Sequence, residues 1–185
     1  MTKQLAIGGA MALLLIAGDA KAVVVESNAQ GFAIEETAHI DAPPAKVYAA
    51  LVHPENWWNS EHTFSQDAKN LSLDPKAGGC LCETLPGGGS VQHLTVASIV
   101  PGRMLLFRGA MGPFLSQGVD GALSFTLKPA GDGTDLVLDN NVGGFVKGGM
   151  SKWPLAADAM LTDLAAHLKY YIENGKPMTA SLPVK

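Results

Sequence analysis

Residues 154–174 read PLAADAMLTDLAAHLKYYIEN, and this stretch decides the fold of the chain. Its large apolar residues recur at helical spacing and form one continuous face: Leu161, Leu164, Ala165, Leu168, Tyr171 and Ile172. Pro154 suits a first helical turn, and the run from Asn174 through Gly175 to Pro177 is a typical helix stop. A long amphipathic helix needs an apolar surface to cover, so the rest of the chain must supply one.

The middle of the chain predicts that surface as an antiparallel sheet. Short runs rich in apolar residues occupy 71–73, 79–85, 91–100, 104–108, 117–128 and 134–142. Turn signals separate them, among them Pro86-Gly-Gly-Gly89, Pro101-Gly102 and Gly143-Gly144. Runs of this length and spacing favour a meander of hairpins. Strands and helices do not alternate here, which excludes a parallel nucleotide-binding sheet.

The residues before the meander predict one strand and two short helical pieces. A strand is expected at 32–40, and the run from Asp41 to Pro44 opens a helix with an apolar stripe at Val47, Ala50 and Leu51. His53-Pro54 ends that helix, because a residue before proline avoids helical dihedrals. Residues 55–64 follow as a short irregular or helical segment. The fold class is therefore α+β, with one sheet and one long helix.

The first 22 residues have the features of a secretory signal peptide. Lys3 precedes an uncharged, mostly apolar stretch at 5–18, and Ala20-Lys21-Ala22 forms an A-x-A cleavage signal. The apolar stretch is short for a membrane span, although an uncleaved anchor is the alternative. We expect cleavage after Ala22, a mature chain without a stable membrane span, and a periplasmic or secreted location. Residues 23–31 are then an N-terminal lead-in, 32–175 the domain, and 176–185 a C-terminal tail.

Charge and cysteine usage exclude several classes of function. A net charge of −4 does not fit nucleic-acid binding. Cys80 and Cys82 are the two cysteines; i and i+2 on a strand lie about 6.6 Å apart, near the upper limit for a disulfide. Two thiols are therefore favoured over a strained disulfide. The five histidines have no metal-ligand spacing, so neither a metal nor a cofactor is expected.

Several local stretches resemble the START-like (SRPBCC) superfamily over residues 32–175. They are Ala42–Leu51 followed by Pro54–Trp58, Gly78-Gly79 before a strand, Val100-Pro101 before Met104–Phe107, and Gly133-Thr134. Residues 108–114 and 142–148 resemble a secreted bacterial branch of its polyketide cyclase/dehydrase and lipid-transport group. The resemblance implies a helix-grip fold, like that of START domains and pollen allergens, in which a curved antiparallel sheet wraps around the C-terminal helix. It also implies a cavity between them for a hydrophobic small molecule or lipid.

Candidate ligand-binding residues are large apolar side chains near the expected cavity, with one amide to orient a ligand. For most of them, packing in the core or within a loop is the alternative interpretation. They are Trp57, Trp58, Phe107, Met111, Phe114, Asn140, Phe145, Trp153, Met160 and Leu164. The Gly109–Pro113 loop around Met111 has the composition of a mobile lid or of a hairpin loop that packs on itself. The glycines around Phe145 indicate either motion or close backbone approach.

Polar candidates are fewer. Arg108 could bind an acidic head group or lie in solvent, and His62 beside Glu61 is a weak candidate for acid–base catalysis. His93 and His167 lie on predicted polar faces and are expected to contact water.

Three functions remain open from the sequence. The first is an exported, cofactor-free binding protein for a hydrophobic molecule. The second is a cofactor-independent cyclase or dehydratase acting on a polyketide-like substrate. The third is an interaction protein whose core is filled.

Overall fold

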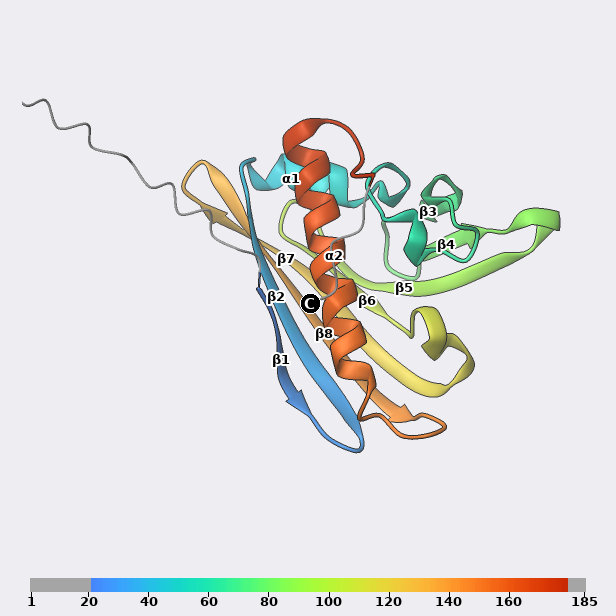
Figure 1. The fold of residues 1–185 in the computed structure, drawn as a ribbon. Helices are drawn as coiled ribbons and strands as arrows, with labels where there is room; N and C mark the ends of the chain where they lie inside the picture. Colours follow the sequence, from blue (N-terminus) through green and yellow to red (C-terminus); the bar gives the residue numbers. More distant parts are fainter. Residues whose placement is uncertain (1–20, 180–185) are drawn as a thin grey trace, which may run out of the picture.

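The computed structural model describes residues 21–179, in which a curved antiparallel sheet of eight strands wraps around the long helix α2 (Trp153–Asn174) (Figure 1). The helix-grip architecture predicted from the sequence is therefore confirmed. The strand order across the sheet is β1-β2-β8-β7-β6-β5-β4-β3. The strands are β1 (Lys21–Ser27), β2 (Gly31–Ile40), β3 (Leu71–Leu73), β4 (Cys80–Thr84), β5 (Ser90–Val100), β6 (Met104–Arg108), β7 (Gly118–Ala130) and β8 (Gly133–Phe145).

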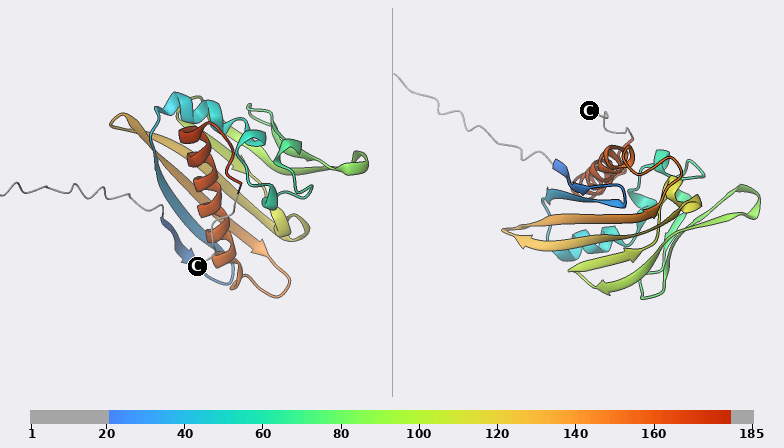
Figure 2. Two further views of the ribbon diagram at one scale, coloured as in Figure 1. Left: turned by 45° about the horizontal axis from the view of Figure 1, so that its top comes forward. Right: turned by 90° about the horizontal axis from the view of Figure 1, so that it is seen from below.

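Short helical pieces close one end of the sheet. The helix α1 (Pro44–Leu51) contacts α2 and lies near its C-terminal part, as Figure 1 and the left view of Figure 2 show. Five short 3₁₀ segments follow among the described residues: η1 (Pro54–Asn56), η2 (Ser60–His62), η3 (Ala68–Asn70), η4 (Pro86–Gly88) and η5 (Gly112–Ser116). The first three lie in the connection between α1 and β3. This connection includes residues 55–64, for which the sequence predicts an irregular or helical segment.

The predicted apolar face of α2 is buried, and the buried face is wider than predicted. Leu161, Leu164 and Leu168 are each at most 1% exposed. Asp163 and His167, assigned to the polar side by helical spacing, are also buried. The sheet covers one side of the helix, and Asn59 and His62 approach Asp163 from the α1–β3 connection. The prediction that His167 contacts water is therefore wrong, because its side chain is buried next to Asp163.

Most predicted strands are present within two residues of their expected ends. The strand predicted at 134–142 is longer than expected, since β8 continues to Phe145. The N-terminal lead-in, for which no strand was predicted, contributes to β1, which pairs with β2 from Lys21↔Thr37 to Ser27↔Phe32. The predicted signal peptide lies outside the described residues as far as residue 20. The expected cleavage after Ala22 falls two residues inside β1. Within residues 21–179, no helix is both long enough and apolar enough to span a membrane.

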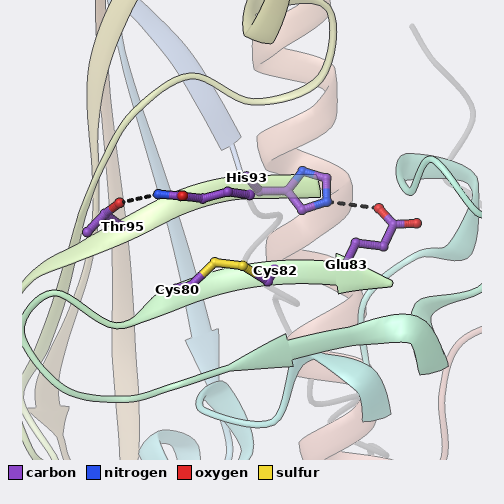
Figure 3. The surroundings of a disulfide bond; sticks show 6 residues. Cys80, Cys82, Glu83, His93 and Thr95 are labelled. Atoms are coloured by element: carbon purple, nitrogen blue, oxygen red, sulfur yellow. Dashed lines mark hydrogen bonds and ion pairs between the residues drawn. A yellow bond between two sulfur atoms is a disulfide. The ribbon is translucent and has the colours of Figure 1, made fainter. Parts of the chain in front are cut away.

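Cys80 and Cys82 form a disulfide, so the prediction of two thiols is wrong (Figure 3). Their Cα atoms are 5.4 Å apart, well inside the range for disulfides, whereas a regular strand places such residues about 6.6 Å apart. The pairing of β4 with β5 also shifts register between Leu81 and Cys82, so the ladder here is not the regular one that the prediction assumed.

Candidate functional site

A cavity of about 590 Å³ lies on the inner side of the sheet, along the first half of α2. Its walls come from η2 and the residues after it, from β5, β7 and β8, from the η5 loop, and from α2. The lining residues are Trp58, Glu61, His62, Thr63, Phe64, His93, Leu94, Gly109, Ala110, Met111, Gly112, Pro113, Phe114, Leu115, Ser116, Leu123, Asn140, Val142, Trp153, Ala156, Ala157 and Met160. A void of this size contradicts the filled-core alternative, since it suits a small organic ligand.

Six of the ten predicted site residues line this cavity: Trp58, Met111, Phe114, Asn140, Trp153 and Met160. The rings of Phe114 and Trp153 pack against each other with centroids 4.8 Å apart and join the η5 loop to the start of α2. Asn140 is buried and faces inward because it continues the β8 alternation that also buries Leu138. Side chains far apart in the sequence thus form one mainly apolar wall.

The other four predicted residues do not line the cavity. Trp57 is 1% exposed and donates its indole N–H to the Ala50 carbonyl oxygen at 3.0 Å, so it fills the core behind α1. Phe107 packs edge-on against Phe125, and Leu164 is part of the sheet–helix core. Phe145 is 75% exposed at the end of β8. Helical and strand spacing predict which side chains face inward. They do not show which of these side chains pack in the core and which line the cavity.

The loop before β7 packs on the protein. Phe114 is 9% exposed and also contacts Phe32 on β2, with ring centroids 6.2 Å apart. Gly112 has a φ of 56°, a left-handed conformation that favours glycine. The glycines around Phe145 were predicted to allow either motion or a close approach of another strand. Gly144 shows the close approach, because a Cβ there would collide with the Gly118 carbonyl oxygen. The ring contacts of Phe114 thus join the loop to β2 and α2, and Met111 is partly buried against the core.

His93 and Glu83 form a buried pair at one end of the cavity (Figure 3). The His93 Nε2 atom lies 2.8 Å from Glu83 Oε2, and the two side chains are 6% and 0% exposed. His93 was expected to contact water. It faces inward because the register between β4 and β5 passes from Gln92↔Cys82 to Leu94↔Leu81, which leaves His93 as the extra residue of a bulge.

Glu83 also holds the chain segment that forms the neighbouring wall. Its carboxylate accepts the backbone N–H groups of Phe64 at 3.0 Å and Ser65 at 2.5 Å. Burial raises the pKa of Glu83, but a hydrogen bond from the Ser65 side chain, the two backbone N–H groups and His93 together outweigh burial and lower its pKa below the usual 4.5. The carboxylate therefore stays ionised and accepts from every partner.

A second histidine–carboxylate pair contributes His62 to the wall of the same cavity. His62 Nε2 is 3.2 Å from Asp163 Oδ2, and the Asn59 amide donates to the same oxygen at 2.7 Å. The predicted partner of His62 was its neighbour Glu61. The structure gives Asp163 on α2 instead, because adjacent side chains diverge whereas the η2 turn faces the helix. His167, one helical turn after Asp163, has its Nε2 3.7 Å from the other carboxylate oxygen.

Two further charged groups lie outside the cavity. Arg108 forms an exposed ion pair with Asp120 on β7, so the structure supports its solvent alternative and not a role in the cavity. Glu36 on β2 is fully buried against α2, and burial, with the nearby charge of Asp158, raises its pKa to about 7. Within residues 21–179 no cluster of three or more His, Cys, Asp or Glu side chains is arranged to hold a metal ion.

Comparison with solved structures shows the same fold at low sequence identity. A conserved protein of unknown function from Enterococcus faecalis matches with a TM-score of 0.60 and 16% identity, over 89% of this chain and 82% of that one. A protein from the dynemicin biosynthetic locus matches with a TM-score of 0.56 and 19% identity, over 78% of this chain and 48% of that one. Ara h 8.0201 matches with a TM-score of 0.55 and 12% identity, over 76% and 97%. No curated protein matches the sequence.

The family comparison agrees with the architecture and the cavity. The family described as polyketide cyclase / dehydrase and lipid transport matches residues 32–173, from the first long strand to the end of α2. This range contains every residue that lines the cavity. The chain therefore belongs to the polyketide cyclase/dehydrase and lipid transport family of START-like proteins.

Proposed function

We propose that this protein is an exported carrier that binds a hydrophobic small molecule or lipid in the cavity between the sheet and α2. The observation that carries the proposal is the cavity of about 590 Å³ with mainly apolar walls. Burial of apolar ligand surface, at about 25 cal/mol per Å², would drive binding without a cofactor. The Cys80–Cys82 disulfide supports export, since disulfides persist in oxidising compartments such as the periplasm.

Filling the cavity is expected to block binding. Ala157 lies on α2, lines the cavity and is 9% exposed, so Ala157→Trp would place an indole in the space that a ligand needs. We expect the affinity for the neutral fluorescent probe N-phenylnaphthylamine to fall at least about tenfold. The indole would occupy space in the cavity, so the bound probe would bury less apolar surface. Fluorescence titration of the purified protein measures this change.

The matched control is Leu155→Trp on the same helix. Leu155 is 76% exposed and does not line the cavity, so this variant adds a similar ring outside the site. It should leave probe affinity within about twofold, and thermal unfolding should show that both variants are folded. If the probe binds the Ala157→Trp variant as tightly as the unmodified protein, the cavity is not the binding site.

A cofactor-independent cyclase or dehydratase on a polyketide-like substrate is a second candidate. The observation that favours it is the presence of His62 and His93 in the wall, each held by a carboxylate, since such histidines can act as general bases. A base in the cavity would accelerate exchange of the acidic hydrogens of an apolar diketone with deuterated water, which NMR measures. If the diketone exchanges its hydrogens no faster with the protein than in buffer alone, the enzyme proposal is wrong.

A further inference from the structure

We propose that the cavity selects ligands whose head group is a neutral hydrogen-bond donor, such as a phenol or alcohol, and that His62 and His93 accept this hydroxyl. This inference rests on the proposed function and names the class of ligand for the same cavity. It follows from which nitrogen of each histidine carries the proton and from the charges around the two rings.

The protonation of His93 follows from its partner. Glu83 already accepts two backbone N–H groups, and an ionised carboxylate has no proton to give. The third contact, with His93 Nε2 at 2.8 Å, therefore requires that Nε2 carry the hydrogen. In the neutral ring Nδ1 is then a hydrogen-bond acceptor. The hydrogen bond of His93 to a described residue is made through Nε2, and the ring packs against Phe64 as part of the cavity wall.

His62 repeats the same arrangement from a different element. Asp163 is 4% exposed and receives the Asn59 amide and His62 Nε2 on one carboxylate oxygen. Donation from Nε2 again leaves Nδ1 of the neutral ring as the acceptor. The side chain of His62 is 35% exposed and lines the cavity. Two imidazoles, each with Nε2 beside a buried carboxylate, thus line one cavity, and in their neutral forms each has an Nδ1 that can accept a hydrogen bond.

The surrounding charges disfavour an anionic head group. Glu61 lines the same end of the cavity, and the carboxylates of Glu83 and Asp163 lie directly behind the two imidazoles. Among the described residues that line the cavity there is no lysine or arginine. A ligand carboxylate or phosphate would meet these carboxylates as like charges, whereas a hydroxyl can donate to a nitrogen at no such cost.

The remaining walls fit the apolar body of such a ligand. Met111, Phe114, Trp153 and Met160 line the part of the cavity formed by the η5 loop and the start of α2. The two histidines lie on other elements of the wall, His62 on η2 and His93 on β5. A ligand with one hydroxyl and one apolar body would therefore bind in a single orientation, with the hydroxyl at the histidines.

A matched set of probes tests this selection. Naphthol, methoxynaphthalene and naphthoate share one apolar body and differ only in the head group. Each would compete with N-phenylnaphthylamine for the purified protein at neutral pH. We expect naphthol to bind about five- to tenfold more tightly than methoxynaphthalene, the range for one hydrogen bond, and more tightly than naphthoate.

Two variants assign the preference to the histidines. His62→Phe and His93→Phe keep a ring in place but remove the acceptor nitrogen, and each should reduce the ratio of naphthol to methoxynaphthalene affinity. His62 is partly exposed, so its variant is expected to fold even if the buried His93 variant does not. His53→Phe is the control, because His53 also pairs with a carboxylate, Glu55 at 3.1 Å, but lies outside the cavity.

The outcomes separate this inference from the proposed function. Equal competition by naphthol and methoxynaphthalene, a preference for naphthoate, or an unchanged ratio in His62→Phe would overturn the inference while the carrier function stands. A protein that does not bind the fluorescent probe would overturn the carrier function, and the inference with it.

Discussion

Replacing Glu83 with alanine is expected to lower the free energy of unfolding by about 3 kcal/mol or more, because three donors lose their shared acceptor. These donors are the Phe64 and Ser65 backbone N–H groups and His93 Nε2, at 3.0, 2.5 and 2.8 Å. Glu83 is 1% exposed, so water cannot readily take its place. Urea unfolding at neutral pH, followed by circular dichroism, measures the loss.

Two companion variants show whether the loss comes from these contacts. Glu35→Ala removes an exposed carboxylate from β2 and should change stability by less than about 0.5 kcal/mol. Glu83→Gln keeps one oxygen that can accept a hydrogen bond but loses the charge. Its loss of stability should therefore lie between those of Glu35→Ala and Glu83→Ala. The Glu83→Ala variant should also bind N-phenylnaphthylamine more weakly, since Glu83 holds Phe64 in the cavity wall. Equal stability of Glu83→Ala and the unmodified protein would show that the pair is not structural.

The contribution of Glu83 should depend on pH in a defined direction. Its pKa is lower in the folded protein than the usual 4.5, so the folded state favours the ionised form. The stabilisation is therefore complete above about pH 4.5 and is lost as the pH falls through the lowered pKa. The stability difference between the unmodified protein and Glu83→Ala should shrink in acid over this window.

The sheet and the long helix could be predicted because their sequence patterns are periodic and local. The apolar spacing from Leu161 to Ile172 predicts one buried helical face, and turn residues divide the meander into its strands. Six cavity residues were also found, since large apolar side chains near loops are the usual lining of such a site.

The polar end of the cavity could not be predicted, because its geometry comes from contacts between distant segments. A bulge turns His93 inward, and strict strand alternation has no means of indicating where an extra residue lies. Asp163 is buried by Asn59, which lies 104 positions earlier in the chain. The prediction of Phe145 as a site residue was wrong because Phe145 lies at the exposed end of β8. A large ring beside glycines does not indicate where a strand ends.

Glu36 is a buried carboxylate in the opposite situation to Glu83. It occupies an inward position of β2, between Ile34 and Ala38, and is 0% exposed. One of its oxygens has no hydrogen-bond partner among the described residues, and the other accepts only a long contact of 3.5 Å from the Thr162 hydroxyl. Loss of solvation, followed by repulsion from Asp158, raises the pKa of Glu36 from 4.5 to about 7. The folded state therefore favours the protonated carboxyl, and ionisation costs stability.

Glu36→Gln is therefore expected to stabilise the protein, by on the order of 2 kcal/mol at pH 8. This value is below the full cost of the pKa shift, because Asp158 is only partly buried and solvent screens the pair. The sign follows from linkage: the unmodified protein loses stability as the pH rises from about 4.5 to about 7, and the neutral amide does not. The gain should be near zero below pH 4, grow through that window and stay constant above it. Urea unfolding at several pH values, with the exposed Glu35→Gln as control, measures the gain. A gain that does not vary with pH would mean that Glu36 has the same pKa in the folded and unfolded protein, and it would contradict the raised pKa.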